Sequence, residues 1–148
     1  MVDSVTNTTT SSDDSPTTQN QGTTTLWQVD IFPVAGQPNR LSAEVLDNAR
    51  DLRVDESLEV IAAHGFLIQG SLTHEDLARL TSELLVEPVV ERCEFALVGS
   101  ESLSQPMGKL PNLLHVLPLP GVTDPQAESA LMAMRHLGFP VDVVRTFK

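Results

Sequence analysis

The sequence has a single cysteine, Cys93, and few basic residues. One cysteine cannot close an intramolecular disulfide or form a thiolate zinc cage by itself, and this usage suits a reducing compartment. Only 9 lysines and arginines stand against 20 acidic residues, which gives a formal net charge of -11. Such a balance argues against a surface that neutralises nucleic-acid phosphates or anionic lipid head groups. Neither nucleic acid nor a membrane is therefore expected as a partner.

Long apolar runs are also missing. No stretch of roughly 18 apolar residues is present that could span a bilayer, and the first residues lack the basic and apolar regions of a secretory signal. We therefore expect a cytoplasmic protein. Hydrophobic residues make up 41% of the 148 residues, which is enough for a modest core.

The composition predicts four regions along the chain. Residues 1–25 are expected to be a disordered tail, because they are almost wholly polar and offer little to bury against the entropy of ordering. A first folded unit is expected over residues 26–99, and a linker rich in polar residues over 100–112. A second, partial unit is expected over residues 113–148.

The first unit is predicted to alternate three strands with two helices. Trp27, Val29 and Ile31 alternate with Gln28 and Asp30, which is typical of a strand with one buried face. The remaining elements follow from helical or alternating spacing between turn residues. They are a helix over 41–52, a strand over 58–68 in which Gly65 permits a bulge or bend, a helix capped by Thr73 that ends at Pro88, and a strand over 89–98 that buries Cys93.

The second unit repeats this pattern but stops short. A strand is predicted over 113–119, and Asp124 with Pro125 predicts the start of a helix. Gly138 stands where a left-handed helix C-cap is expected, and another strand begins at Val141. The second helix and third strand of the first unit have no counterpart here.

Two stretches resemble a known family. Pro120-Gly121-Val122-Thr123-Asp124-Pro125 is followed after one helix by Val143-Val144-Arg145-Thr146-Phe147-Lys148. This order is similar to the PurS family, whose members run from a strand through a Pro-Gly-Val turn and an Asp-Pro helix start to a Val-Arg strand. Residues 26–98 resemble a whole PurS unit, including the segment Leu84-Leu85-Val86-Glu87-Pro88-Val89-Val90-Glu91. The first unit departs from the family in having Gly36-Gln37-Pro38 in place of the Gly-Val-x-Asp-Pro turn.

The resemblance implies a fold and a role. The fold is α+β and PurS-like, with helices on one face of mainly antiparallel sheets, as one complete βαβαβ unit and a partial βαβ repeat. PurS is the non-catalytic subunit that joins the amidotransferase and synthetase subunits of phosphoribosylformylglycinamidine synthase. That ligase complex makes formylglycinamidine ribonucleotide from formylglycinamide ribonucleotide, ATP and glutamine in purine biosynthesis. The expected partners are the synthetase and glutaminase components and further copies of the chain.

A tandem PurS-like region also forms the N-terminus of large single-chain synthetases. This chain, whose second unit stops short, looks like such a region cut early. A natural short subunit and a fragment of a longer synthetase therefore both stay open.

No catalytic, cofactor-binding or metal-binding residue is expected. The four histidines are scattered and form no His-Glu-x-x-His pair, which argues against a zinc site. Cys93 lies near Glu91 and Glu94, and negative neighbours raise the pKa of a thiol, which disfavours a nucleophile. His115 is interpreted as a partly buried structural histidine. Glycines before helices lack the spacing of a phosphate-binding loop and are interpreted as turn residues.

The remaining expectation is an exposed surface through which the chain assembles with partners. Leu114, Val116, Val141 and Val143 lack the cover of the missing second helix, so their cover must come from the first unit or from outside the chain. Arg145 is a candidate polar contact, because arginine is enriched at interfaces.

Two other functions stay open. One is a ferredoxin-like regulatory domain that binds a small metabolite, such as an amino acid, between units. The other is an acylphosphatase-like enzyme, which would need an anion cradle of Arg and Asn that the sequence does not show.

Overall fold

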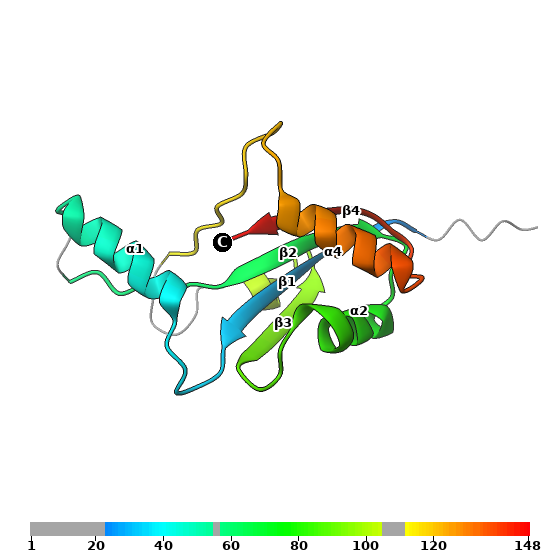
Figure 1. Cartoon of the computed structure of the whole chain (residues 1–148), viewed down its shortest axis with the longest axis horizontal. Helices are drawn as coiled ribbons and strands as arrows, with labels where there is room; N and C mark the ends of the chain where they lie inside the picture. Colours follow the sequence, from blue (N-terminus) through cyan, green and yellow to red (C-terminus); the bar gives the residue numbers. More distant parts are fainter. Residues whose placement is uncertain (1–22, 55–56, 105–111) are drawn as a thin grey trace, which may run out of the picture.

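A four-stranded antiparallel sheet with the strand order β3-β1-β2-β4 organises the protein. The computed structural model describes residues 23–54, 57–104 and 112–148. The strands are β1 (Thr25–Pro33), β2 (His64–Gly70), β3 (Glu91–Leu97) and β4 (Val141–Phe147). The predicted α+β class with an antiparallel sheet is therefore confirmed (Figure 1).

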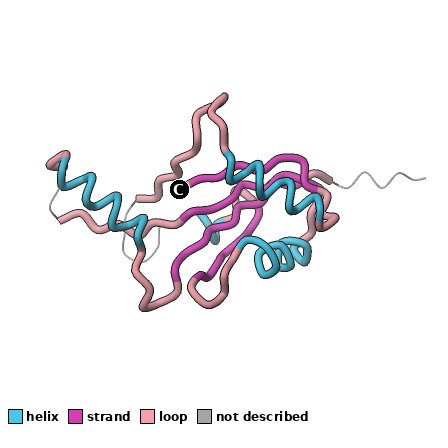
Figure 2. Tube along the Cα trace, in the orientation of Figure 1, coloured by secondary structure: helices cyan, strands magenta, loops and turns pink. Residues whose placement is uncertain are grey.

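Two helices cover one face of this sheet, while another helix projects beyond it (Figures 1 and 2). The helices are α1 (Arg40–Asp51), α2 (His74–Leu80), which continues into the π-helical turn η1 (Thr81–Leu85), α3 (Glu101–Ser104) and α4 (Pro125–His136). Leu77 and Leu80 of α2 and Met134 of α4 are fully buried against Val29 and Ile68 of the sheet. Burial of apolar side chains between helices and sheet is the main stabilising term of such a layer. No helix in the described ranges is long and apolar enough to cross a membrane.

The two predicted units share one sheet. β4, expected in the second unit, pairs with β2 of the first, with Val144 opposite Ile68. The expected strand over 113–119 is not a strand, although Val116 and Lys148 exchange two backbone hydrogen bonds of 2.7 and 3.0 Å. Because Pro118 has no N–H to donate, the segment cannot continue that pairing as a ladder.

β2 begins later than the predicted strand over 58–68, and Pro33 gives the physical reason. The register that sets Ile31 opposite His64 would set Pro33 opposite Ala62, and a proline cannot donate to that ladder. The backbone of Ala62 instead bonds side chains at the start of α1. Its carbonyl accepts from Asn39 Nδ2 at 2.7 Å, and its N–H donates to Ser42 Oγ at 2.9 Å.

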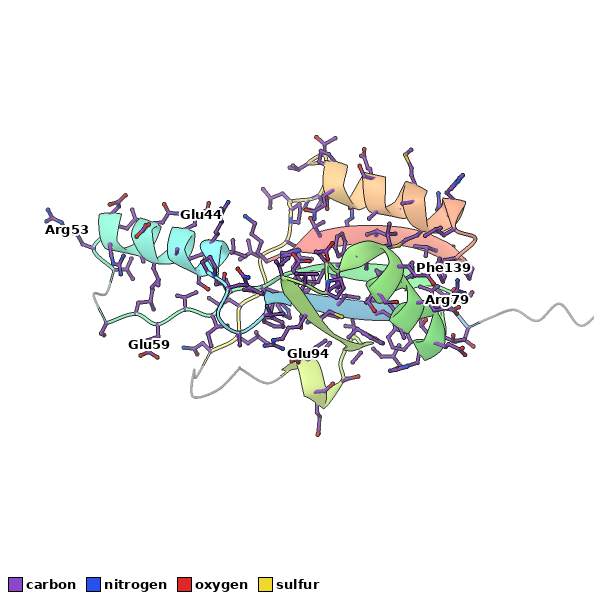
Figure 3. The ribbon with its side chains drawn as sticks, turned by 60° about the horizontal axis from the view of Figure 1, so that its bottom comes forward. Glu44, Arg53, Glu59, Arg79, Glu94 and Phe139 are labelled. Atoms are coloured by element: carbon purple, nitrogen blue, oxygen red, sulfur yellow. The ribbon has the colours of Figure 1, made fainter. Side chains whose placement is uncertain are left out.

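Both ends of α4 follow their predicted chemistry. Asp124 is the N-cap, with its carboxylate accepting from Ala127 N–H at 3.0 Å, and Pro125 is the first helical residue. Gly138 has a φ of +86° just after the C-terminus. The N–H of the next residue, Phe139, donates to the Met134 carbonyl at 3.1 Å, which completes a Schellman cap. In Figure 3, Arg79 of α2 lies next to Phe139, with its guanidinium 5.2 Å from the ring centroid.

Candidate functional site

An extended apolar segment, residues 113–119, lies against the end of β4 and is here named the strap. Its backbone is fixed to the sheet at the Val116–Lys148 pair. The side chains nevertheless point largely into solvent: Leu114 is 81% exposed and Val116 is 62% exposed. Exposed apolar residues are Leu113, Leu114, Val116, Leu117 and Leu119. Contiguous exposed apolar residues are unusual on the surface of a monomer. They indicate a binding surface more often than single, scattered apolar residues do.

The structure separates the predicted interaction residues into two groups. Val143 is 42% exposed, whereas Val141 is only 4% exposed and belongs to the core. The cause is a register shift between β2 and β4: Gln69 pairs with Val143 but the adjacent Gly70 pairs with Val141, which leaves Asp142 as an extra residue in β4. Such a bulge interrupts the alternation of side chains along the strand. Val141 is covered by its own chain and is therefore left out of the exposed surface.

Val143 and Arg145 lie on the face of the sheet that α2 and α4 leave open. Their neighbour Val144 faces the core, so the two flanking side chains point to the opposite face. Val143 is five residues from Lys148, or about 17 Å along a strand at about 3.3 Å per residue. The strap and Val143 therefore form an elongated surface and not a single pocket.

His115 differs from its predicted environment. It is exposed, and its ring packs edge-on against Phe147 with centroids 5.3 Å apart. The expectation of a partly buried histidine fails because 113–119 is a surface strap and not an interior strand. The contact adds a side-chain anchor to the backbone pair at Val116.

The face of β1 that carries the polar residues Gln28 and Asp30 is partly buried in the structure. Gln28 is buried, and its Nε2 donates to both oxygens of Asp30 at 3.1 Å. Burial raises the pKa of Asp30, while the Gln28 hydrogen bond and the electrostatic interaction with His115 act in the opposite direction. No local signal in β1 could reveal this, because the burial comes from distant parts of the chain.

A hollow of about 590 Å³ opens at the base of α1. It is lined by apolar residues of β1 and by polar residues that include Asn39, Arg40, His64 and Glu91. This size is within the range of small-molecule sites, but the hollow is only partly enclosed.

Within 23–54, 57–104 and 112–148, no group of three or more His, Cys, Asp and Glu side chains is placed to hold a metal ion. Cys93 lies on β3, half-buried, and packs against the core. No family model, no curated protein and no solved structure matches this chain.

Proposed function

We propose that this chain is a non-catalytic assembly module of the PurS type that serves phosphoribosylformylglycinamidine synthase in the cytoplasm. The observation that carries the proposal is the strap, an exposed apolar segment held in a fixed place on the sheet. The proposal also rests on the resemblance of residues 26–98 and 120–148 to PurS units.

The strap has the properties of a docking segment. Its anchoring at Val116 means that ordering it on a partner costs little conformational entropy, since its backbone is already placed. Leu114 and Leu119 project from it, and apolar side chains of this kind gain about 25 cal/mol per Å² when a partner removes them from water. Pro118 keeps the segment from pairing further within its own chain.

The open sheet face beside the strap supplies a polar rim. Arg145 stands on the same face as Val143, and arginine at the rim of an interface pairs with carboxylates on a partner. The synthetase and glutaminase components are the proposed partners of this combined surface.

The decisive test is binding of the full chain to these two components by analytical ultracentrifugation. Val116→Asp is expected to weaken binding by at least about tenfold, because a charge would have to be desolvated within the interface. Val116 uses only its backbone to bond Lys148, so the substitution should leave the fold intact.

Met132→Asp is the matched control. Met132 is an exposed apolar residue on α4, outside the strap, and its replacement by a charge should leave binding within about twofold. Glu75→Ala, on α2, should be equally neutral. If the wild-type chain binds neither component, or if the Val116 and Met132 variants lose binding equally, the assembly function is wrong.

A metabolite-binding regulatory domain is the second candidate, and the hollow at the base of α1 is the observation in its favour. A saturable rise in melting temperature with an amino acid or nucleotide would support this alternative. Arg40→Ala should then abolish the rise, while Arg53→Ala, outside the hollow, should retain it.

A further inference from the structure

The outer edge of β4 is partly blocked by groups of its own chain. Thr146 N–H donates to Asp124 Oδ2 at 2.9 Å. At the two ends of the strand, further groups fill the edge: the Arg135 guanidinium donates to the carbonyls of Val141 and Asp142, and the strap bonds Lys148. These contacts block both ends of the edge and the Thr146 N–H, so another strand could not form a continuous ladder there.

Within the described part of the chain, no strand pairs with the outer edge of β3. Val98 N–H donates to the carbonyl of Leu26 in β1 at 2.9 Å. In an antiparallel strand, the backbone N–H and C=O groups of every second residue point toward the same neighbouring strand. Even-numbered residues of β3 therefore face β1, and Cys93 and Phe95 present their N–H and C=O groups outward. Among the described residues, these outward groups have no hydrogen-bond partner.

At each end of β3, one of the two outward backbone groups is already hydrogen-bonded within the chain, which limits the row of free outward groups. The N–H of Glu91 donates to the Glu87 carbonyl at 2.8 Å, which leaves the Glu91 carbonyl free. The carbonyl of Leu97 accepts from Ser100 N–H at 3.0 Å, which leaves the Leu97 N–H free. The free row thus runs from an acceptor at one end to a donor at the other.

We propose that β3 pairs antiparallel with β3 of a second copy of this chain, about a two-fold axis through Glu94. That axis places the Glu91 carbonyl opposite the Leu97 N–H of the second copy, and Cys93 opposite Phe95. Each free donor then meets a free acceptor. A row of groups that complements itself under a two-fold rotation is what an isologous interface requires. The inference does not depend on the proposed function, because β3 and the strap are different surfaces.

Side chains favour the same register. Val90 and Val98, which flank β3, are 39% and 46% exposed, and the axis through Glu94 sets each opposite the other in the second copy. A shift of the axis to Cys93 would set Val90 opposite Ala96 instead. It would also direct a carbonyl of the second copy at the Glu91 N–H, which already donates to Glu87.

Glu94 is the residue that opposes this pairing. On the axis it faces its own copy, and like charges directly opposite each other are destabilising. Arg92 Nη1 lies 2.8 Å from Glu94 Oε1 and offsets part of that charge. Figure 3 shows Glu94 on β3, at the side of the sheet away from α4.

The register is tested by cross-linking of the full chain in a Cys93→Ser background. Glu94→Cys would face itself across the axis, at a Cα separation of about 4.5–5.5 Å that a disulfide can bridge. Arg92→Cys is the control, because it would face Ala96 and lie four residues away from its own copy. Mild oxidation should give at least tenfold more disulfide-linked dimer with Glu94→Cys. Equal yields, or no linked dimer with Glu94→Cys, would overturn the pairing.

Sedimentation equilibrium of the chain alone gives a second, independent reading. Cys93→Pro removes an outward N–H donor and leaves the hydrogen bonds between β3 and β1 in place. The dissociation constant of the dimer should therefore rise by at least tenfold. Glu94→Gln removes the repulsion on the axis and should tighten the dimer about twofold to fivefold. Val116→Asp should leave it unchanged, which separates this dimer from the assembly function. A wild type and a Glu94→Gln variant that both stay monomeric would refute the proposal, whatever the other variants do.

Discussion

At the scale of single residues, Gly65 shows how closely the strands of this sheet approach. A Cβ on this residue would overlap the Val29 carbonyl oxygen and the ring of Phe147. The glycine thus serves close packing, and the irregularity that the sequence placed at Gly65 lies instead between Gln69 and Gly70.

Gly65→Ala is therefore expected to lower the free energy of unfolding by about 1–3 kcal/mol, the cost of overpacking a filled site. Urea denaturation measures the change. Gly99→Ala is the comparison, because a Cβ there meets nothing within 4 Å and only the positive φ opposes it. If Gly65→Ala lowers the free energy of unfolding by no more than Gly99→Ala does, the sheet accommodates the added Cβ at little cost and the prediction is wrong.

At the scale of elements, Asp124 joins α4 to β4. One carboxylate oxygen caps α4 through Ala127 N–H, and the other accepts from the N–H and hydroxyl of Thr146, each at 2.9 Å. Burial alone would raise the pKa of Asp124, but the hydrogen bonds from Thr146 and Ala127 hold the pKa below its ordinary value.

This lowered pKa predicts a pH dependence of stability. The folded state binds the proton of Asp124 less readily than the unfolded chain does, so its contribution is complete above the unfolded pKa, near about 4, and is lost as the pH falls through the folded pKa. Asp124→Asn cannot accept from Thr146 N–H through its amide nitrogen, and should cost about 1–3 kcal/mol at pH 7. The difference from wild type should shrink below about pH 4.

Urea unfolding of both proteins across this range checks the prediction, with the exposed Asp142→Asn as the control. A difference that stays constant from neutral to acid pH would exclude the Asp124 carboxylate as its source.

Local chemistry made α1, α2 and α4 predictable, whereas α3 falls within residues 100–112, which were expected to be a linker. The pairing of the strands was only partly predictable. Asp124, Pro125 and Gly138 specify α4 by short-range hydrogen bonds, and the alternation in Trp27 to Ile31 specifies β1. The joining of β4 to β2 depends on residues far apart in the chain, and no local pattern reports it.

The candidate surface was predictable to the same extent. The strap residues Leu114 and Val116 stand out as apolar residues without cover, as the sequence indicates. Val141 and Val143 share a parity that predicts a common face, and the register shift at Gly70 breaks it. The open edge of β3 follows from strand order, which the sequence does not specify.

At the scale of the whole molecule, the first strand, β1, begins at Thr25 and is tied there to the end of β2. The Thr25 hydroxyl donates to the carbonyls of Gly70 and Leu72, at 3.0 and 3.2 Å, and accepts from Trp27 Nε1 at 2.9 Å. The predicted tail, residues 1–25, thus overlaps β1 by one residue, and residues 1–22 lie outside the described part of the chain.

Removal of residues 1–24 is expected to change the free energy of unfolding by less than about 1 kcal/mol, because their composition offers nothing to a core. Thr25→Val in the full chain should cost about 1 kcal/mol through its lost hydrogen bonds. Chemical denaturation of the two variants makes the comparison. A truncation that costs more than the single substitution would show that the tail packs.

The unequal edges of the sheet determine how large an assembly can become. A sheet with two free edges can add further copies of the chain at both edges without limit, as in fibrils. Here the side chains of Asp124 and Arg135 and the strap block one edge, and the proposed partner at β3 would use up the other. Growth by strand addition would therefore stop at two copies, and the contacts that hold α4 to β4 would also protect the protein from aggregation.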